Sequence, residues 1–424
     1  MATSNKRWSS ALAIIVIAVL SLLAFAPSPA TAAGPTVVDG GVQDNFPDGM
    51  VFSVHAEGDT ISKIRLLYKI LPDGTSAIAR PDLTAANSVD ATVTIGGAQL
   101  YLPPGTVIQY QWEATDATGA VSTTEMQSFF YNDVRFPWKK VDGQGMTIYY
   151  YSGSDSDAAD MHAVAEKAIA DAEDLLNTTV PFEVQVWLYE NQDDMRPALQ
   201  RTSPGFESQI ITEGVKVASN TVLVLGTSSS DTLRHELTHV VTGQAGDSPL
   251  GHLTTWLDEG TAVHGQLDPG GYKDAIDAGI ADDNVLSVRE ITSYPGDASK
   301  IGIFYGEAWS IVSYLVDTYG KQKYAQLFAD IKAGKGVDKS FQLVYGFDQD
   351  GLDNAWRFSK GLPARDTPAP TTTAPSSTTI PTLAPVTSTD SGGSSTTEII
   401  AIALGVLLLA GVVGYGGIMF ARRL

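Results

Sequence analysis

Residues 231–243 read DTLRHELTHVVTG, and the prediction of fold and chemistry depends on the HELTH within them. His235 and His239 are four residues apart, so a helix places both imidazoles on one face, one turn apart. That spacing suits two nitrogen ligands of one Zn²⁺ ion. Glu236 lies one position further round, where it can reach a water on the ion and act as a general base. The alternative is an exposed helix with a His–Glu–His surface cluster.

A third ligand is available in TTWLDEGTAVHG, residues 254–265, on a second predicted helix. Glu259 would be a costly isolated carboxylate there unless it is paired or bound to a metal. Two histidines, one glutamate and one open position form the ligand set of catalytic rather than structural zinc. His252 and His264 compete with Glu259 for this role, although His264 lies about 140° round the same helix.

Together the two segments resemble the gluzincin metallopeptidases and are similar to the HExxH and WLNEGFA arrangement of aminopeptidase N-type enzymes. The greatest likeness is to bacterial peptidase MA-like domains, over about residues 135–360, including a later FYGEAWSIVSYLVDTYG helix. The resemblance implies zinc ligands His235, His239 and Glu259, with Glu236 as the base.

The chain also departs from these families. It has no clear GxMEN-type segment, and Asp258 stands where many relatives have Asn, so the resemblance does not imply aminopeptidase activity. The metzincin pattern fails on spacing, because it needs glycine and histidine where this chain has Thr242 and Ala245.

The expected mechanism lowers the pKa of a zinc-bound water toward about 7, and Glu236 takes its proton and later delivers it to the leaving amine. Gluzincins often stabilise the oxyanion with a Tyr or His on a downstream helix, which suggests Tyr305, with Tyr314 behind it. Core packing is the alternative role for Tyr305. The stretch SNTVLVLG, residues 219–226, is either an edge strand for an extended peptide substrate or an ordinary sheet strand.

The remaining patterns predict a multidomain chain. Residues 34–133 alternate with period two between turn signals and resemble an immunoglobulin-like or fibronectin type III-like β-sandwich. In this region Ile108, Tyr110 and Trp112 fall on one face of a predicted strand. Residues 134–361 read as strands and helices followed by helices alone, an α+β peptidase domain.

Both ends of the chain carry targeting signals. Residues 1–33 read as a signal peptide, and 398–420 as a transmembrane helix followed by a basic tail at 421–424. Between domain and helix, residues 362–397 are rich in Pro, Thr and Ser and predict a disordered stalk. We therefore expect a single-pass protein of the cell membrane with its N-terminal ectodomain outside.

Composition excludes some classes of partner and of chemistry. The net charge of −21 makes nucleic acid a poor partner, and the absence of cysteine excludes disulfides and thiolate chemistry. The sequence therefore predicts a membrane-anchored zinc metallopeptidase that acts on protein or peptide, a cell-wall peptide included. The alternative is a surface adhesion or scaffold protein with an inactive peptidase-like domain, and the partner of the β-sandwich is unknown.

Overall fold

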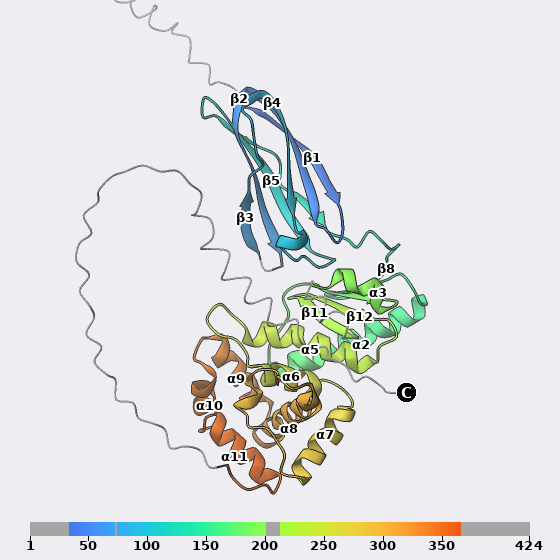
Figure 1. The fold of residues 1–424 in the computed structure, drawn as a ribbon, viewed down its shortest axis with the longest axis vertical. Helices are drawn as coiled ribbons and strands as arrows, with labels where there is room; N and C mark the ends of the chain where they lie inside the picture. The colour runs from blue at the N-terminus through green and yellow to red at the C-terminus, as the bar shows by residue number, and fades with distance from the viewer. Residues whose placement is uncertain (1–33, 73, 201–212, 366–424) are drawn as a thin grey trace, which may run out of the picture.

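The computed structural model describes residues 34–72, 74–200 and 213–365 (Figure 1). The predicted signal peptide, transmembrane helix and cytoplasmic tail, and nearly all of the predicted stalk, lie outside these residues. Within the described part of the chain, no helix has the length and apolar character needed to span a membrane.

The N-terminal domain is an antiparallel β-structure built around one long strand. The first half of β2 pairs with β1 and β4, and its second half pairs with β3 and β5. Ile108, Tyr110 and Trp112 of β5 are buried, as their alternation predicts. The strands are β1 (Thr36–Asp44), β2 (Met50–Leu71), β3 (Thr75–Ala79), β4 (Ala86–Ile95), β5 (Val107–Asp116), β6 (Val121–Thr123) and β7 (Gln127–Phe130).

A second, mixed sheet has the strand order β11-β12-β10-β9-β8. Its three central strands run parallel, and the two outer strands are antiparallel to their neighbours. The bounds are β8 (Lys139–Asp142), β9 (Met146–Tyr150), β10 (Val184–Tyr189), β11 (Gly214–Ala218) and β12 (Thr221–Leu225). Residues 219–226 are not the edge strand but an ordinary strand of the sheet, because β11, which was not predicted, pairs along β12 and takes the edge.

Strand β10 is buried on both faces, which joins the two domains. Val186 packs on one face with helices α2 (Asp155–Leu176) and α5 (Ser230–Gly246). Trp187, the next residue, faces the N-terminal domain. Its ring stacks on that of Tyr149 of β9 at a centroid distance of 4.2 Å and on that of Phe130 of the N-terminal domain at 6.2 Å. The N-terminal domain and α3 (Gln192–Met195) therefore cover one face of the sheet, and α2 and α5 cover the other (Figure 1).

The rest of the chain is helical and packs below the sheet in Figure 1. Helix α6 crosses α8 closely at Gly260, where an added Cβ would lie 2.5 Å from the backbone oxygen of Ala308. Only glycine permits this approach, which brings α6 toward α5. The elements are α6 (Thr255–His264), α7 (Gly271–Ala281), α8 (Ile301–Tyr319), α9 (Lys321–Lys332), α10 (Val337–Val344) and α11 (Gln349–Ser359).

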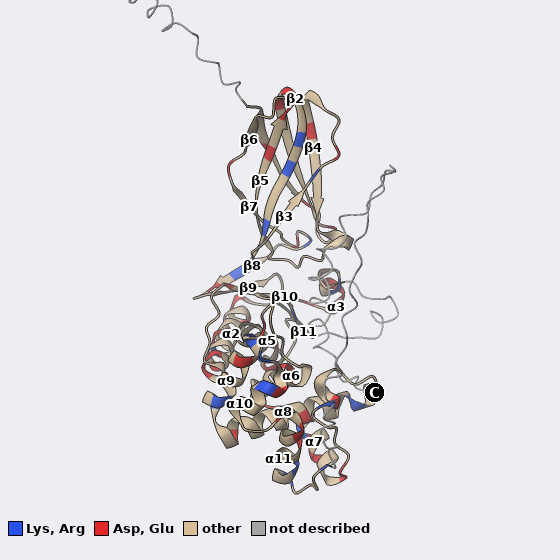
Figure 2. Cartoon of the chain, turned by 90° about the vertical axis from the view of Figure 1, so that its left-hand side faces the viewer, with Lys and Arg blue, Asp and Glu red and all other residues tan. Residues whose placement is uncertain are grey.

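Charged residues of both signs are interspersed over both domains (Figure 2). One buried carboxylate, Asp133, lies at the junction between the domains. It accepts hydrogen bonds from Tyr189 at 2.8 Å and from Nε of Arg135 at 2.7 Å. Arg135 also donates to the backbone oxygen of Asp194 at 2.7 Å. Asp133 thus ties the linker between the domains to the end of β10.

We expect Asp133→Ala to lower the free energy of unfolding by about 3 kcal/mol, because the substitution leaves a tyrosine hydroxyl and a guanidinium without their buried partner. Urea unfolding of the purified protein measures this change. The control is Asp160→Ala, on an exposed position of α2, which should have almost no effect. Equal stabilities of the two variants would show that Asp133 does not hold the junction.

Candidate metal centre

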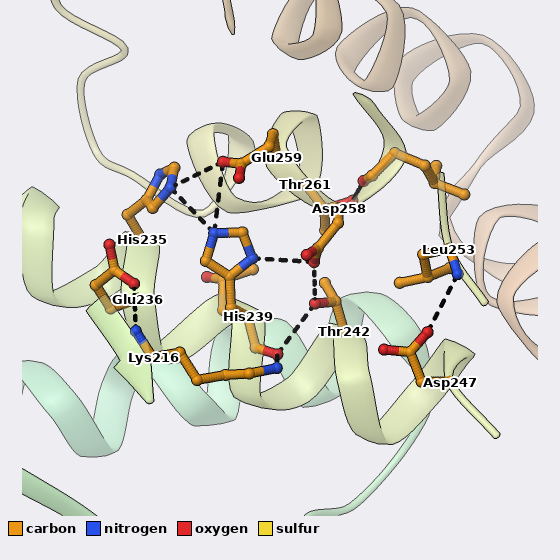
Figure 3. A network of polar contacts seen from close by, with 12 residues as sticks. Lys216, His235, Glu236, His239, Thr242, Asp247, Leu253, Asp258, Glu259 and Thr261 are labelled. Carbon is orange, nitrogen blue, oxygen red and sulfur yellow. Dashed lines mark hydrogen bonds and ion pairs between the residues drawn. The ribbon is translucent and has the colours of Figure 1, made fainter. Parts of the chain in front are cut away.

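Helix α5 is oriented by its apolar face. Its first turn is capped by the Ser229 hydroxyl, which accepts from the backbone N–H of Thr232 at 3.1 Å. Leu233, Leu237 and Val240 recur at helical spacing and pack against the sheet. The histidines of HELTH are consequently directed away from the sheet, toward α6 (Figure 3).

The structure brings His235, His239 and Glu259 together at one point (Figure 3). The two Nε2 atoms lie 3.2 Å apart, and Glu259 Oε2 lies 3.3 Å from the first and 3.5 Å from the second. Zinc bound tetrahedrally at about 2.0–2.1 Å requires neighbouring ligand atoms to be separated by about 3.3 Å. The three atoms therefore already form one face of such a tetrahedron.

The chemistry of these atoms also fits a cation. Glu259 Oε2 is buried and has no hydrogen-bond partner in the described part of the chain. Two nitrogen lone pairs and an anionic oxygen repel one another at this separation unless a positive charge lies between them. The carboxylates of Glu236, Asp258 and Glu259 outnumber the nearby ammonium of Lys216, which also interacts with Asp247. A divalent cation would offset this excess of negative charge.

Tyr294 holds the other oxygen of Glu259. Its hydroxyl donates a hydrogen bond to Oε1, which leaves Oε2 free for a metal. Tyr294 in turn shares a hydrogen bond with Tyr305. Burial, followed by the charge of Glu259, raises the pKa of both hydroxyls well above their ordinary values, so both tyrosines stay protonated. Tyr305 is therefore placed one hydrogen bond behind a ligand.

His239 is fixed from its far side. Its Nδ1 lies 3.0 Å from Asp258 Oδ1, and the same oxygen accepts a hydrogen bond from Thr242 at 2.5 Å. A carboxylate that accepts from Nδ1–H makes Nε2 the metal-binding nitrogen and increases its basicity. Asp258 is thus the partner of a candidate ligand, a role that its position next to Glu259 in sequence did not reveal.

Glu236 is buried beside the two histidines and held by the edge strand. The backbone N–H of Lys216 donates to Glu236 Oε2 at 2.9 Å, and the Lys216 ammonium donates to the carbonyl of His239 at 2.8 Å. Burial raises the pKa of Glu236, and the neighbouring histidines oppose that shift. A carboxylate in this setting holds a proton more readily than an exposed one, as a general base requires.

The competing ligands lie elsewhere. His252 is half exposed, with its Nδ1 3.7 Å from Asp247, and His264 contacts the Ser313 hydroxyl at 3.2 Å. Tyr314 contacts the hydroxyl of Tyr319 at 3.4 Å. None of these residues is in the cluster of three donors found in the described part of the chain.

Comparison with known proteins gives one family match. Residues 164–360 match the Peptidase MA superfamily, and this range includes all three converging side chains, so this part of the chain is similar to that superfamily. No curated protein matches the chain. Among solved structures the chain is similar to a mutant M1 zinc metallopeptidase from Deinococcus radiodurans, at 14% identity and a TM-score of 0.33, over 76% of this chain and 92% of that one. A TM-score at this level carries no argument about fold or activity.

We expect the purified protein to bind one zinc ion and Glu259→Ala to lower its zinc affinity by at least tenfold, because the substitution removes one of three ligands. Metal analysis after dialysis against a weak chelator gives the zinc content. Glu125→Ala, an exposed carboxylate of the N-terminal domain, is the matched control and should keep its zinc. Full zinc retention by Glu259→Ala would exclude this carboxylate as a ligand.

Proposed function

We propose that the protein is a zinc metallopeptidase that hydrolyses peptide bonds in protein or peptide substrates. One observation carries the proposal: three buried donor atoms converge at tetrahedral spacing, and a buried carboxylate, Glu236, follows His235 in α5. The match of residues 164–360 to the Peptidase MA superfamily supports it. A purely structural zinc site would leave no role for that additional carboxylate.

His235, His239 and Glu259 would hold the zinc ion. When bound, zinc supplies a Lewis acid that activates water and polarises the scissile carbonyl. Glu236 accepts the proton of the attacking water and donates it to the leaving nitrogen, so the base is regenerated with each turnover. The Lys216 N–H holds Glu236 Oε2 in place beside the two histidines.

The edge strand β11 supports an extended mode of substrate binding. Strand β11 pairs with β12 on one side and has no strand on its other side in the described part of the chain. The Lys216 N–H points to Glu236 rather than to β12, so the free edge of β11 faces the base. A peptide that adds to this edge by backbone hydrogen bonds would bring its carbonyl groups past the metal centre.

Two tyrosines are available to stabilise the oxyanion. Tyr305, the choice from sequence, is buried and engaged with Tyr294. Tyr272, at the start of α7, stacks on the Tyr305 ring at 4.9 Å and is only partly buried. Burial, then the charges of Glu259 and Glu236, raises the pKa of Tyr272 to about 12, which keeps its hydroxyl a donor beside the centre. We therefore assign the oxyanion to Tyr272 and a supporting role to Tyr305.

The location of the enzyme is proposed from sequence alone. The signal-like residues 1–33, the apolar stretch 398–420 and the basic tail after it are the features of an exported protein held by one C-terminal helix. The Pro- and Thr-rich residues 362–397 would then act as a spacer between membrane and peptidase domain.

Glu236→Gln tests the proposed chemistry. We expect it to keep its zinc but to lose at least a hundredfold in kcat for cleavage of casein or a peptide library, because the amide cannot accept a proton. Glu190→Gln, an exposed position, is the control and should cleave normally. If the unaltered protein binds zinc but cleaves nothing, or if Glu236→Gln cleaves as well as the unaltered protein, the assignment of peptidase activity fails.

Replacement of each tyrosine by phenylalanine separates their roles. We expect Tyr272→Phe to lower kcat by about a hundredfold with little change in KM, since an oxyanion donor acts mainly in the transition state. Tyr305→Phe should lower kcat by a smaller factor, because its hydroxyl is engaged in a hydrogen bond with Tyr294. Steady-state kinetics on one peptide substrate measures both, and the reverse order of effects would return the assignment to Tyr305.

A further inference from the structure

The turn that follows α6 is attached to a single face of α5. The backbone oxygen of Gly265 accepts from Nε of Arg234 at 2.8 Å, and the N–H of Leu267 donates to Asp231 Oδ1 at 2.6 Å. Arg234 is itself held by Asp171 of α2 at 2.8 Å. The Arg234 guanidinium bonds both this turn and α2, and the Asp231 carboxylate accepts from a backbone N–H of the turn. These contacts give the turn a defined position.

The approach of the turn to α5 depends on glycine at 265. A Cβ on Gly265 would lie 2.4 Å from the hydroxyl oxygen of Thr238. The positions on α5 that the turn meets are 231, 234, 235 and 238, which share one face of a helix. The residue between Gly265 and Leu267 is thereby brought against His235.

That residue is Gln266, whose amide nitrogen Nε2 lies 3.0 Å from His235 Nδ1 and donates to it in this orientation. Gln266 is the group that contacts this nitrogen in the described part of the chain, and Nε2 of the same ring faces His239 and Glu259. For Nε2 to bind a metal, the ring proton must be on Nδ1, and Nδ1–H needs an acceptor. The amide supplies one when its oxygen Oε1 faces the ring, since half a turn about the last side-chain bond exchanges its oxygen and nitrogen.

We propose that Gln266 is a positioning residue that selects the metal-binding tautomer of His235 by accepting a hydrogen bond from Nδ1–H. With the amide nitrogen facing the ring, as the structure has it, Nδ1 accepts and the proton is placed on Nε2, which closes this nitrogen to zinc. With the oxygen facing the ring, Nε2 is open. The orientation of one amide is therefore coupled to metal binding. This inference rests on the proposed function, because it assumes a metal at the three donors.

The two histidines would then have different outer partners. His239 faces the carboxylate of Asp258, and His235 faces a neutral amide. A carboxylate on both rings would add a further negative charge to a centre that already has the carboxylates of Glu236, Asp258 and Glu259. The neutral partner orients His235 without that charge.

The test is the dissociation constant for Zn²⁺, measured by competition with a chromophoric chelator, in Gln266→Leu and Gln266→Glu. Leucine is similar in size but accepts no hydrogen bond, so we expect zinc affinity to fall about tenfold or more. Glutamate accepts from Nδ1–H, so affinity should equal or exceed that of the unaltered protein. The control is Gln322→Leu, on an exposed position of α9, which should not change it.

The apo-protein melting temperature of each variant separates a folding defect from a metal-binding defect, since loss of positioning should weaken zinc binding without lowering apo stability. A dissociation constant for Gln266→Leu within twofold of the unaltered protein would overturn the inference. Equal weakening in Gln266→Glu would overturn it too, because the acceptor would then not matter. If the unaltered protein binds no zinc, the proposed function itself fails, and this inference fails with it.

Discussion

The structure depends on one electrostatic constraint, the convergence of two imidazole nitrogens and one carboxylate oxygen inside the protein. Such atoms repel one another, so the surrounding structure must hold them in place, and a positive charge between them would lower the repulsion. Apolar packing fixes α5 on the sheet, and the close crossing of α6 and α8 at Gly260 fixes Glu259. Tyr294, Asp258 and Lys216 then restrict the orientation of the groups around this point.

The sequence predicted those parts of the site that a local pattern determines. Helical spacing gave His235 and His239, and the second segment gave Glu259, because each ligand is part of a regular helix. Tyr294 follows no periodic pattern, since it reaches Glu259 from a loop. Lys216 contacts Glu236 through its backbone N–H, and Gln266 reaches His235 from the turn after α6. Both contacts form only when elements that are separate in the sequence are adjacent in the fold. No spacing in one dimension encodes such contacts.

The secondary structure also divides into elements that a local pattern predicts and elements that it does not. Strand β12 was predicted within residues 219–226, because its continuous apolar run is typical of a buried strand. The edge strands β8 (KKVD) and β11 (GVKVA) were missed, because neither contains more than two large apolar residues. The position of β12 inside the sheet follows from the pairing of β11. The apolar run of β10 is typical of a strand that is buried on both faces, but the run does not identify what covers each face.

Because the N-terminal domain packs on the mixed sheet, it is part of the structure that supports the candidate metal centre. Trp187 packs against Phe130 of that domain, and Tyr189 donates to Asp133, where the domain ends. The domain can still present surfaces to a partner, but it supports the sheet on which α5 and the candidate metal centre rest.

X-ray absorption spectroscopy of the zinc-loaded protein tests the central claim most directly, because it reports the atoms around the metal without requiring a substrate. The account predicts four nitrogen or oxygen neighbours at about 2.0–2.1 Å, with the outer-ring scattering of two imidazoles. A shell with one imidazole or none, or one of six oxygen neighbours, would contradict a centre built from His235, His239 and Glu259.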